Sequence, residues 1–65
     1  MVFKHKGRTY SISDKNENNE YVVAKINPNS RKVEAAKIIE GSSKKEVMLK
    51  IKRFTFNKFK DLPIN

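Results

Sequence analysis

The feature that most constrains the fold is a pair of apolar runs rich in β-branched residues, "YVVAKI" and "RKVEAAKII", separated by "NPNS". Pro28 fixes the φ angle that the first central position of a turn needs, and Asn29 tolerates the second. Two such runs around a turn predict an antiparallel hairpin over residues 21–39. Alanine and glutamate in "VEAAKII" also suit a helix, but the short length and the nearby proline favour a strand.

Apolar side chains occupy both faces of this hairpin. In the first run Val22, Ala24 and Ile26 lie opposite Tyr21 and Val23, because side chains alternate along a strand. In the second run Ala36 and Ile38 lie opposite Val33, Ala35 and Ile39. The alternation therefore does not decide which face meets the core.

An earlier hairpin is expected over residues 1–12. Two short runs flank Lys6 and Gly7, and glycine readily takes the positive φ of a tight hairpin turn. The alternative is one irregular strand with a glycine bulge. Residues 13–20, "SDKNENNE", contain no apolar side chain, so we expect a solvated loop there.

A C-terminal helix is expected over residues 43–61. Ser43 followed three residues later by Glu46 matches a capping box. Pro63 disfavours helix just before it, so we expect the helix to end before Leu62. The fold class predicted for residues 1–65 is one small α+β domain, with an antiparallel sheet of three to four strands packed against this helix.

The helix segment "KKEVMLKIKRFTFNKFK" divides on a wheel of about 100° per residue. The stripe expected to face the core consists of Val47, Met48, Ile51, Phe54, Thr55, Phe59 and Leu62, with Lys58 lying inside the same arc. Leu49 and Phe56 point away from that stripe, among basic residues, and are the candidate partner-binding pair. The open alternative is that the regular helix frays after Phe54 and that "RFTFN" is strand-like, which would remove the outward pair.

Charge is the main functional signal. The chain has 15 Lys and Arg against 7 Asp and Glu, a formal net charge of +8, in 65 residues. Such an excess attracts polyanions, meaning nucleic acid, anionic lipid or an acidic protein, unless it is only a solvated lysine surface.

Basic residues gather in three groups: around the second hairpin, on the helix, and at the first turn. The first two groups supply the candidate nucleic-acid contacts, which are Lys25, Arg31, Lys32, Lys37, Lys45, Lys52, Arg53 and Lys60. The third group is Lys4, Lys6 and Arg8. Stacking on bases would come from Tyr10 or Tyr21, although half-buried tyrosines more often belong to the edge of a core.

The order of elements around "EGSSKKEV", a hairpin and then a helix, resembles the small AP2-like DNA-binding domains at the N-terminus of phage and transposon integrases. The resemblance covers residues 20–60 and has no sharp motif; "NPNS" stands where that family often has a glycine-containing turn. It implies that the sheet face enters the major groove while the helix packs behind. Lys25, Arg31, Lys32 and Lys37 would then fall among the sheet contacts.

Catalysis and cofactors are not expected. The sequence has no glycine-rich phosphate loop and no histidine beside a nucleophile, and His5 alone cannot build a zinc site without cysteine. We expect no metal. We also expect no membrane span, because "VMLKI" is far shorter than a spanning helix, and a soluble cytoplasmic protein, because the absence of cysteine fits a reducing compartment.

Two functions follow from the residues. The first is a nucleic-acid-binding module, intracellular or phage-encoded, that contacts phosphates of DNA in preference to RNA. The second is a protein-interaction module, such as a small phage-type inhibitor or accessory subunit, that docks an acidic partner through Leu49 and Phe56 or through a strand edge. A strand edge that pairs with itself would make a homodimer.

Overall fold

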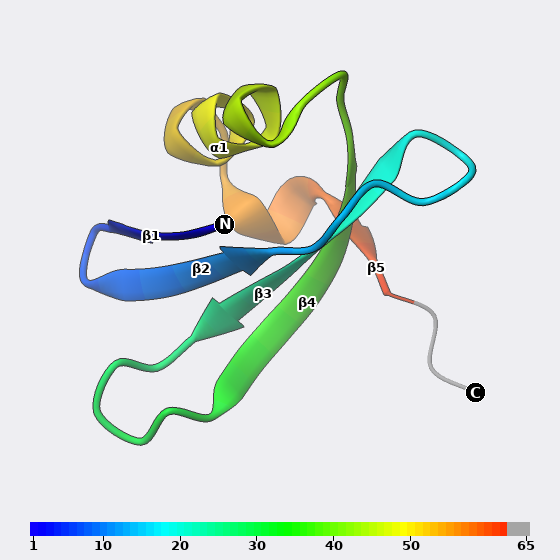
Figure 1. Cartoon of the computed structure of the whole chain (residues 1–65). Helices are drawn as coiled ribbons and strands as arrows, with labels where there is room; N and C mark the ends of the chain where they lie inside the picture. The colour runs from blue at the N-terminus through cyan, green and yellow to red at the C-terminus, as the bar shows by residue number, and fades with distance from the viewer. Residues whose placement is uncertain (63–65) are drawn as a thin grey trace.

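The computed structural model describes residues 1–62 as an antiparallel sheet of five strands with one helix across one face (Figure 1). Sheet order follows chain order, β1-β2-β3-β4-β5. The strands are β1 (Val2–His5), β2 (Arg8–Ile12), β3 (Glu20–Ile26), β4 (Val33–Glu40) and β5 (Lys60–Asp61). The helix α1 (Lys44–Arg53) and a 3₁₀ turn, η1 (Phe56–Lys58), come between β4 and β5. The predicted α+β class is confirmed, with five strands in place of three or four.

The first hairpin forms as predicted. Lys6 and Gly7 connect β1 to β2 with φ angles of 49° and 76°. Two consecutive positive φ values match the right-handed twist of the flanking strands. In the resulting register Phe3 lies beside Tyr10, and their rings stack with centroids 5.3 Å apart.

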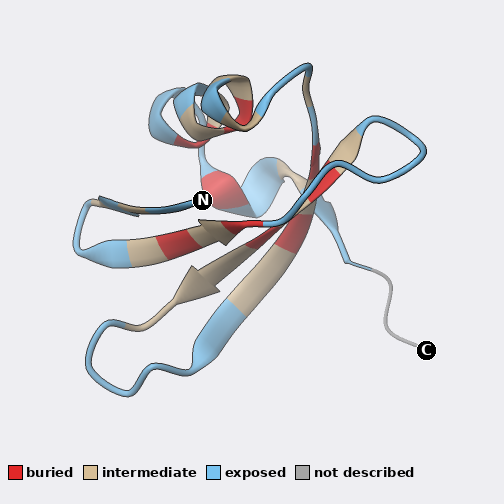
Figure 2. Cartoon of the chain, in the orientation of Figure 1, coloured by how far each residue is buried: buried red, intermediate tan, exposed pale blue. Residues whose placement is uncertain are grey.

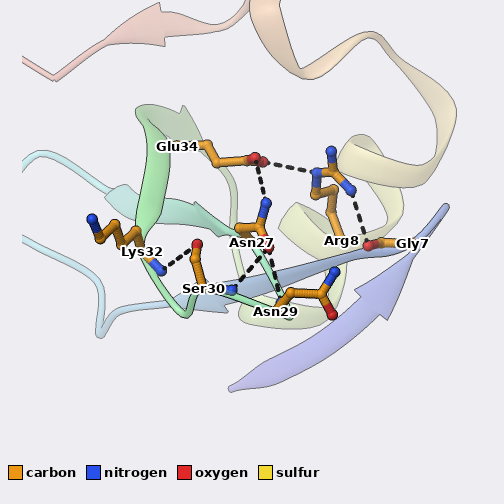
Figure 3. Close-up of polar contacts among 7 residues, drawn as sticks. All are labelled: Gly7, Arg8, Asn27, Asn29, Ser30, Lys32 and Glu34. Atoms are coloured by element: carbon orange, nitrogen blue, oxygen red, sulfur yellow. Dashed lines mark hydrogen bonds and ion pairs between the residues drawn. The ribbon is translucent and has the colours of Figure 1, made fainter.

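The second hairpin also forms, but its turn is longer than "NPNS" alone suggests (Figure 3). Asn27 organises the connection, because its side-chain oxygen accepts hydrogen bonds from the backbone N–H of Asn29 at 2.9 Å and of Ser30 at 3.2 Å. The residue in the left-handed region is Arg31, with φ 59°. The Asn27 N–H then donates to the Lys32 carbonyl at 2.9 Å and closes the loop.

One face of the sheet is the core, and the structure shows which (Figure 2). The side chains buried between the sheet and the helical layer are Tyr10, Ile12, Tyr21, Val23, Ile39, Val47, Ile51 and Phe56. The register rows place the alternate residues on the opposite side. We call that side the open face; its apolar residues on the two central full-length strands, β3 and β4, are Val22, Ala24, Ile26, Val33, Ala36 and Ile38.

The expected N-cap, Ser43, starts the helix, but the Glu46 half of the capping box reaches Ser42, one residue before the cap, in place of the Ser43 N–H. The Ser43 hydroxyl accepts a hydrogen bond from the Glu46 N–H at 3.2 Å. The Glu46 carboxylate reaches back to the Ser42 N–H at 2.9 Å and also accepts from the Ser42 hydroxyl. The two bonds from Ser42 hold the pKa of Glu46 below its ordinary 4.5, and the bond from the Ser42 hydroxyl has the larger effect. The carboxylate is therefore charged near the positive end of the helix.

The helix ends at Arg53, so the prediction that it continues to residue 61 was wrong. The Phe54 N–H still donates to the Lys50 carbonyl at 2.9 Å, but Phe54 itself is extended, with φ −119° and ψ 161°. The chain then turns Phe56 inward, where its ring meets Tyr10 at 5.3 Å and Phe59 at 6.4 Å. Burial of a large aromatic ring in that cluster outweighs the few helical hydrogen bonds lost.

The early end of the helix corrects the core stripe at its C-terminal half. Phe54, expected inside, is 59% exposed, and Phe56, expected outside, is 7% exposed. Thr55 and Leu62, also placed in the stripe, are exposed. Val47 and Ile51 are buried as expected, and Met48 and Phe59 are partly buried and pack against the core.

The short strand β5 is attached to β4 by a buried cation. Lys37 is 7% exposed, and its ammonium donates to the Asp61 carboxylate and, at 3.5 Å, to the Asn57 carbonyl. Lys37 pairs directly with Asp61 in the register. The cation therefore holds the chain segment after the helix against the sheet.

Candidate nucleic-acid interface

The meander separates charge along the strands. The turns between β1 and β2 and between β3 and β4 lie at one end of the sheet, and the loops after β2 and β4 lie at the other (Figure 1). Residues 4–10 and 25–35, which form the half with the turns, contain six cations and one acid. Residues 11–24 and 36–43, which form the other half, contain two cations and four acids. The four acids of this acidic end are Asp14, Glu17, Glu20 and Glu40.

The helix extends this polarity. It begins at the acidic end, where the Lys44 ammonium meets the Asp14 carboxylate at 2.8 Å and lowers the pKa of that acid. Its last turn carries Lys52 and Arg53, and the Lys52 ammonium lies 5.9 Å from the Phe3 ring on β1. We call the resulting surface the basic end; its cations are Lys4, Lys6, Arg8, Lys25, Arg31, Lys32, Lys52 and Arg53.

Most of these cations are available to a ligand. Among residues 1–62, the one basic-end cation in an ion pair is Arg8, whose Nε lies 2.8 Å from a Glu34 carboxylate oxygen. Glu34 occupies the position where the β3–β4 register shifts, and its second oxygen accepts from the Asn27 side chain at 3.2 Å (Figure 3). The single acid of this half therefore braces the two hairpins together.

Aromatic rings position two of the lysines. The Lys25 ammonium lies 5.7 Å from the centroid of Phe56, as Lys52 lies against Phe3. Both rings contact Tyr10. Burial raises the pKa of the Tyr10 hydroxyl; of the smaller effects, the charge of Arg8 lowers this pKa and the charge of Glu34 raises it. Cation–π contacts of this kind contribute about 0.5–1 kcal/mol at exposed sites. They therefore orient the two lysine side chains and leave their positive charges without an acidic partner.

Five of the eight cations predicted as contacts lie at the basic end: Lys25, Arg31, Lys32, Lys52 and Arg53. Lys37 does not, because burial and Asp61 occupy its ammonium, and its prediction as a contact was wrong. Lys45 is exposed in the first turn of α1, away from this end. Lys60 pairs with Ile38 on the other half of the sheet.

The outward pair also divides. Leu49 is 47% exposed, as expected, but Phe56 belongs to the core, so its prediction as a partner-binding residue was wrong. The aromatic that the wheel missed is Phe54, which follows Lys52 and Arg53 directly and is exposed. The strand-like alternative for "RFTFN" would not have found it either, because residues i and i+2 of a strand share a face and that alternative places Phe54 with Phe56.

The sheet contacts implied by the integrase resemblance do not share one face. Lys25 and Lys37 are register partners of Tyr10 and Val23, which are core residues, so both lie on the helix side. The open face that would enter a groove has Ala24 and Ala36 at its middle. Phosphate contacts across that face are therefore not supported by its composition.

Comparison with protein-family models, curated proteins and solved structures finds no match to this chain. In the part of the chain that the structure describes, no group of three or more acidic, histidine or cysteine side chains is placed to hold a metal. No helix within residues 1–62 has the length and apolar character needed to cross a membrane.

Proposed function

We propose that this chain is a small nucleic-acid-binding module that holds a phosphate backbone at its basic end. The observation that carries the proposal is the concentration of eight cations around the two hairpin turns and the end of α1, opposed there by Glu34 alone. Cations clustered on one end attract a polyanion more strongly than the same charge spread evenly.

Phe54 adds an exposed aromatic ring, which binding to phosphates alone would not require. It is exposed beside Arg53, at the point where the helix ends. An exposed ring among cations suits an unpaired base, which stacks on an aromatic face while its phosphates meet the lysines and arginines. The preferred ligand is therefore single-stranded nucleic acid, with DNA and RNA distinguished by experiment.

The test is a fluorescence anisotropy titration with labelled 20-nucleotide single strands of DNA and RNA and the matching duplexes. Arg31→Gln/Lys32→Gln removes two charges from the basic end. Lys45→Gln/Lys60→Gln removes two charges elsewhere and is the matched control. We expect the first variant to weaken single-strand binding about tenfold at about 50 mM salt and to reduce the salt slope by about 1.4, and the control to change little.

Absence of binding at about 50 mM salt would overturn the proposal. Equal losses in both double variants would also overturn it, because net charge alone would then explain the affinity. A second comparison tests the ring: Phe54→Ala should weaken single-strand binding by about 1–3 kcal/mol, as loss of one stacked base does, whereas Phe54→Trp should retain it.

The protein-interaction alternative loses its main support. One of its two routes needed Leu49 and Phe56 together, and a single exposed leucine does not make a docking patch. The other route, pairing through a strand edge, stays a prediction. The apolar surface of interest lies elsewhere, on the open face of the sheet.

A further inference from the structure

The open face of the sheet is apolar where a solvated face is normally polar. An antiparallel sheet with one face in water usually alternates apolar residues inward with polar ones outward. Here the two central full-length strands instead carry valine, alanine and isoleucine outward as well. On the same face, Val33 of β4, the register partner of Ile26, is 60% exposed, and Val2 of the edge strand β1 is 68% exposed. Among residues 1–62, α1 and η1 both pack on the opposite face.

The size of the chain makes even partial exposure costly, and the side chains at the middle of the open face are half-buried. Within residues 1–62 the core contains eight buried apolar residues, and a domain of about 60 residues buries only about 60% of the surface of its unfolded chain. Covering the open face would contribute about 25 cal/mol for each Å² of apolar surface removed from water. A surface of this kind indicates a docking partner.

A second copy of the chain fits the dimensions of the face. The two longer extents of the molecule are 33 and 29 Å. A standard stable interface buries about 800 Å² per partner, and the outline of the molecule on this side, at most 33 by 29 Å, is large enough to contain one. Small and β-branched side chains such as Ala24, Ala36 and Val22 allow two sheets to approach at the usual spacing of about 10 Å.

Charge decides the orientation of the two copies. Glu20 and Glu40 are direct cross-strand partners at the acidic end, and like charges in that position are destabilising. The ion pairs found within residues 1–62 involve neither of them. A partner whose strands run antiparallel across the interface would bring the start of its β4, beside Lys32, over the end of this β4, at Glu40.

The same orientation separates the two basic ends, which limits repulsion between chains of net charge +8. We infer that the open face is the interface of a two-fold homodimer, in which the sheets stack with the basic end of each copy over the acidic end of the other. This inference does not depend on the proposed nucleic-acid binding.

The first test is the molar mass of the chain by sedimentation equilibrium over a concentration series up to about 1 mM, well above a micromolar Kd. We expect a shift from monomer to dimer for the wild type. Ala24→Lys places a charge at the middle of the open face and should shift the equilibrium at least tenfold toward monomer. Leu49→Lys makes a similar change on the outer side of α1 and should leave the equilibrium unchanged. Circular dichroism confirms that each variant is folded.

A wild type that remains monomeric, or a dimer that survives Ala24→Lys, would overturn the inference, as would a dimer that is weakened equally by Leu49→Lys. A charge exchange tests the orientation without adding bulk to the face. Lys32→Glu and Glu40→Lys should each weaken the dimer several-fold, and the double variant should recover most of the loss. Failure of the double variant to recover would exclude the antiparallel arrangement.

Discussion

At the scale of single residues, two phenylalanines exchange the roles that helical periodicity assigns them. The wheel places Phe54 inside and Phe56 outside because it continues at 100° per residue. Two extended residues after Arg53, Phe54 and Thr55, break that count. Tyr10 and Phe59 then receive Phe56, and Phe54 is left in solvent. The periodicity could not show this, because the gain comes from a ring on a distant strand.

The exchange predicts opposite effects from the same substitution. Phe56→Ala should destabilise the fold by about 3–5 kcal/mol, because it leaves a cavity among Tyr10 and Phe59. Phe54→Ala should change stability by no more than about 0.5 kcal/mol, as exposed positions usually do. Urea denaturation followed by circular dichroism measures both. Similar losses in the two variants would contradict the burial that distinguishes them.

Arg31 allows the cost of its backbone strain to be separated from its contribution to nucleic-acid binding. Its left-handed conformation costs a non-glycine residue about 1–2 kcal/mol. Arg31→Gly should therefore raise stability by about 0.5–1 kcal/mol while weakening binding of single-stranded oligonucleotide. Arg31→Gln is the matched control: it removes the same charge, keeps the strain, and should weaken binding with no gain in stability. Thermal melts and anisotropy titrations of the two variants separate these effects, and equal stability of both would show that the strain is negligible.

At the scale of elements, local signals predicted what local interactions decide. The glycine turn, the hairpin over residues 21–39 and the cap at Ser43 depend on neighbours in the sequence, and all three are present. The fifth strand was missed because "KD" has no strand signal of its own. Lys37 holds it from across the sheet, and a buried lysine cannot be recognised before its partner, Asp61, is placed.

The cap predicts how stability depends on pH. Hydrogen bonds from Ser42 lower the pKa of Glu46 in the folded chain, so the charged form favours the folded state. This contribution is complete above the unfolded pKa, near 4.5, and is lost as the pH falls through the lower folded pKa. Glu46→Gln should thus be less stable than wild type at neutral pH, and the two should become nearly equal once the pH lies well below the lowered folded pKa. Glu17→Gln, the same change in the polar loop, should show no such convergence in thermal melts.

The buried ion pair of β5 predicts an asymmetry between its two partners. Asp61→Ala leaves the Lys37 ammonium buried with only the Asn57 carbonyl, and should destabilise the fold by about 1 kcal/mol, moderated because the Asp61 side chain is exposed. Lys37→Met replaces the cation with an apolar chain of similar length and should be neutral or stabilising. Urea denaturation of both variants gives the order, and a larger loss in Lys37→Met would mean that the ion pair itself stabilises the fold.

At the scale of the whole molecule, the strand meander gathers charges that are scattered along the sequence into a basic end and an acidic end. In the sequence, the basic residues of the first turn, the second hairpin and the helix end are separated by tens of positions. Strand pairing brings both turns to one end, and the direction of α1 adds Lys52 and Arg53 there. The three groups were visible as separate clusters. That they form one basic end, and that Lys45 and Lys60 lie outside it, could be seen only once the topology of the sheet and helix was known.

If the chain dimerises through the open face, the stability of the fold should depend on protein concentration. If folding and association are coupled through the open face, unfolding a 130-residue dimer absorbs about 0.7 kcal/mol per residue, and Tm should rise by about 5 °C for each tenfold increase in concentration. Ala24→Lys should lower Tm at high concentration and remove the dependence, whereas Leu49→Lys should keep it. Calorimetry over two decades of concentration measures the slope. A flat Tm in the wild type would mean that the monomer is stable by itself and that the open face contributes nothing to folding.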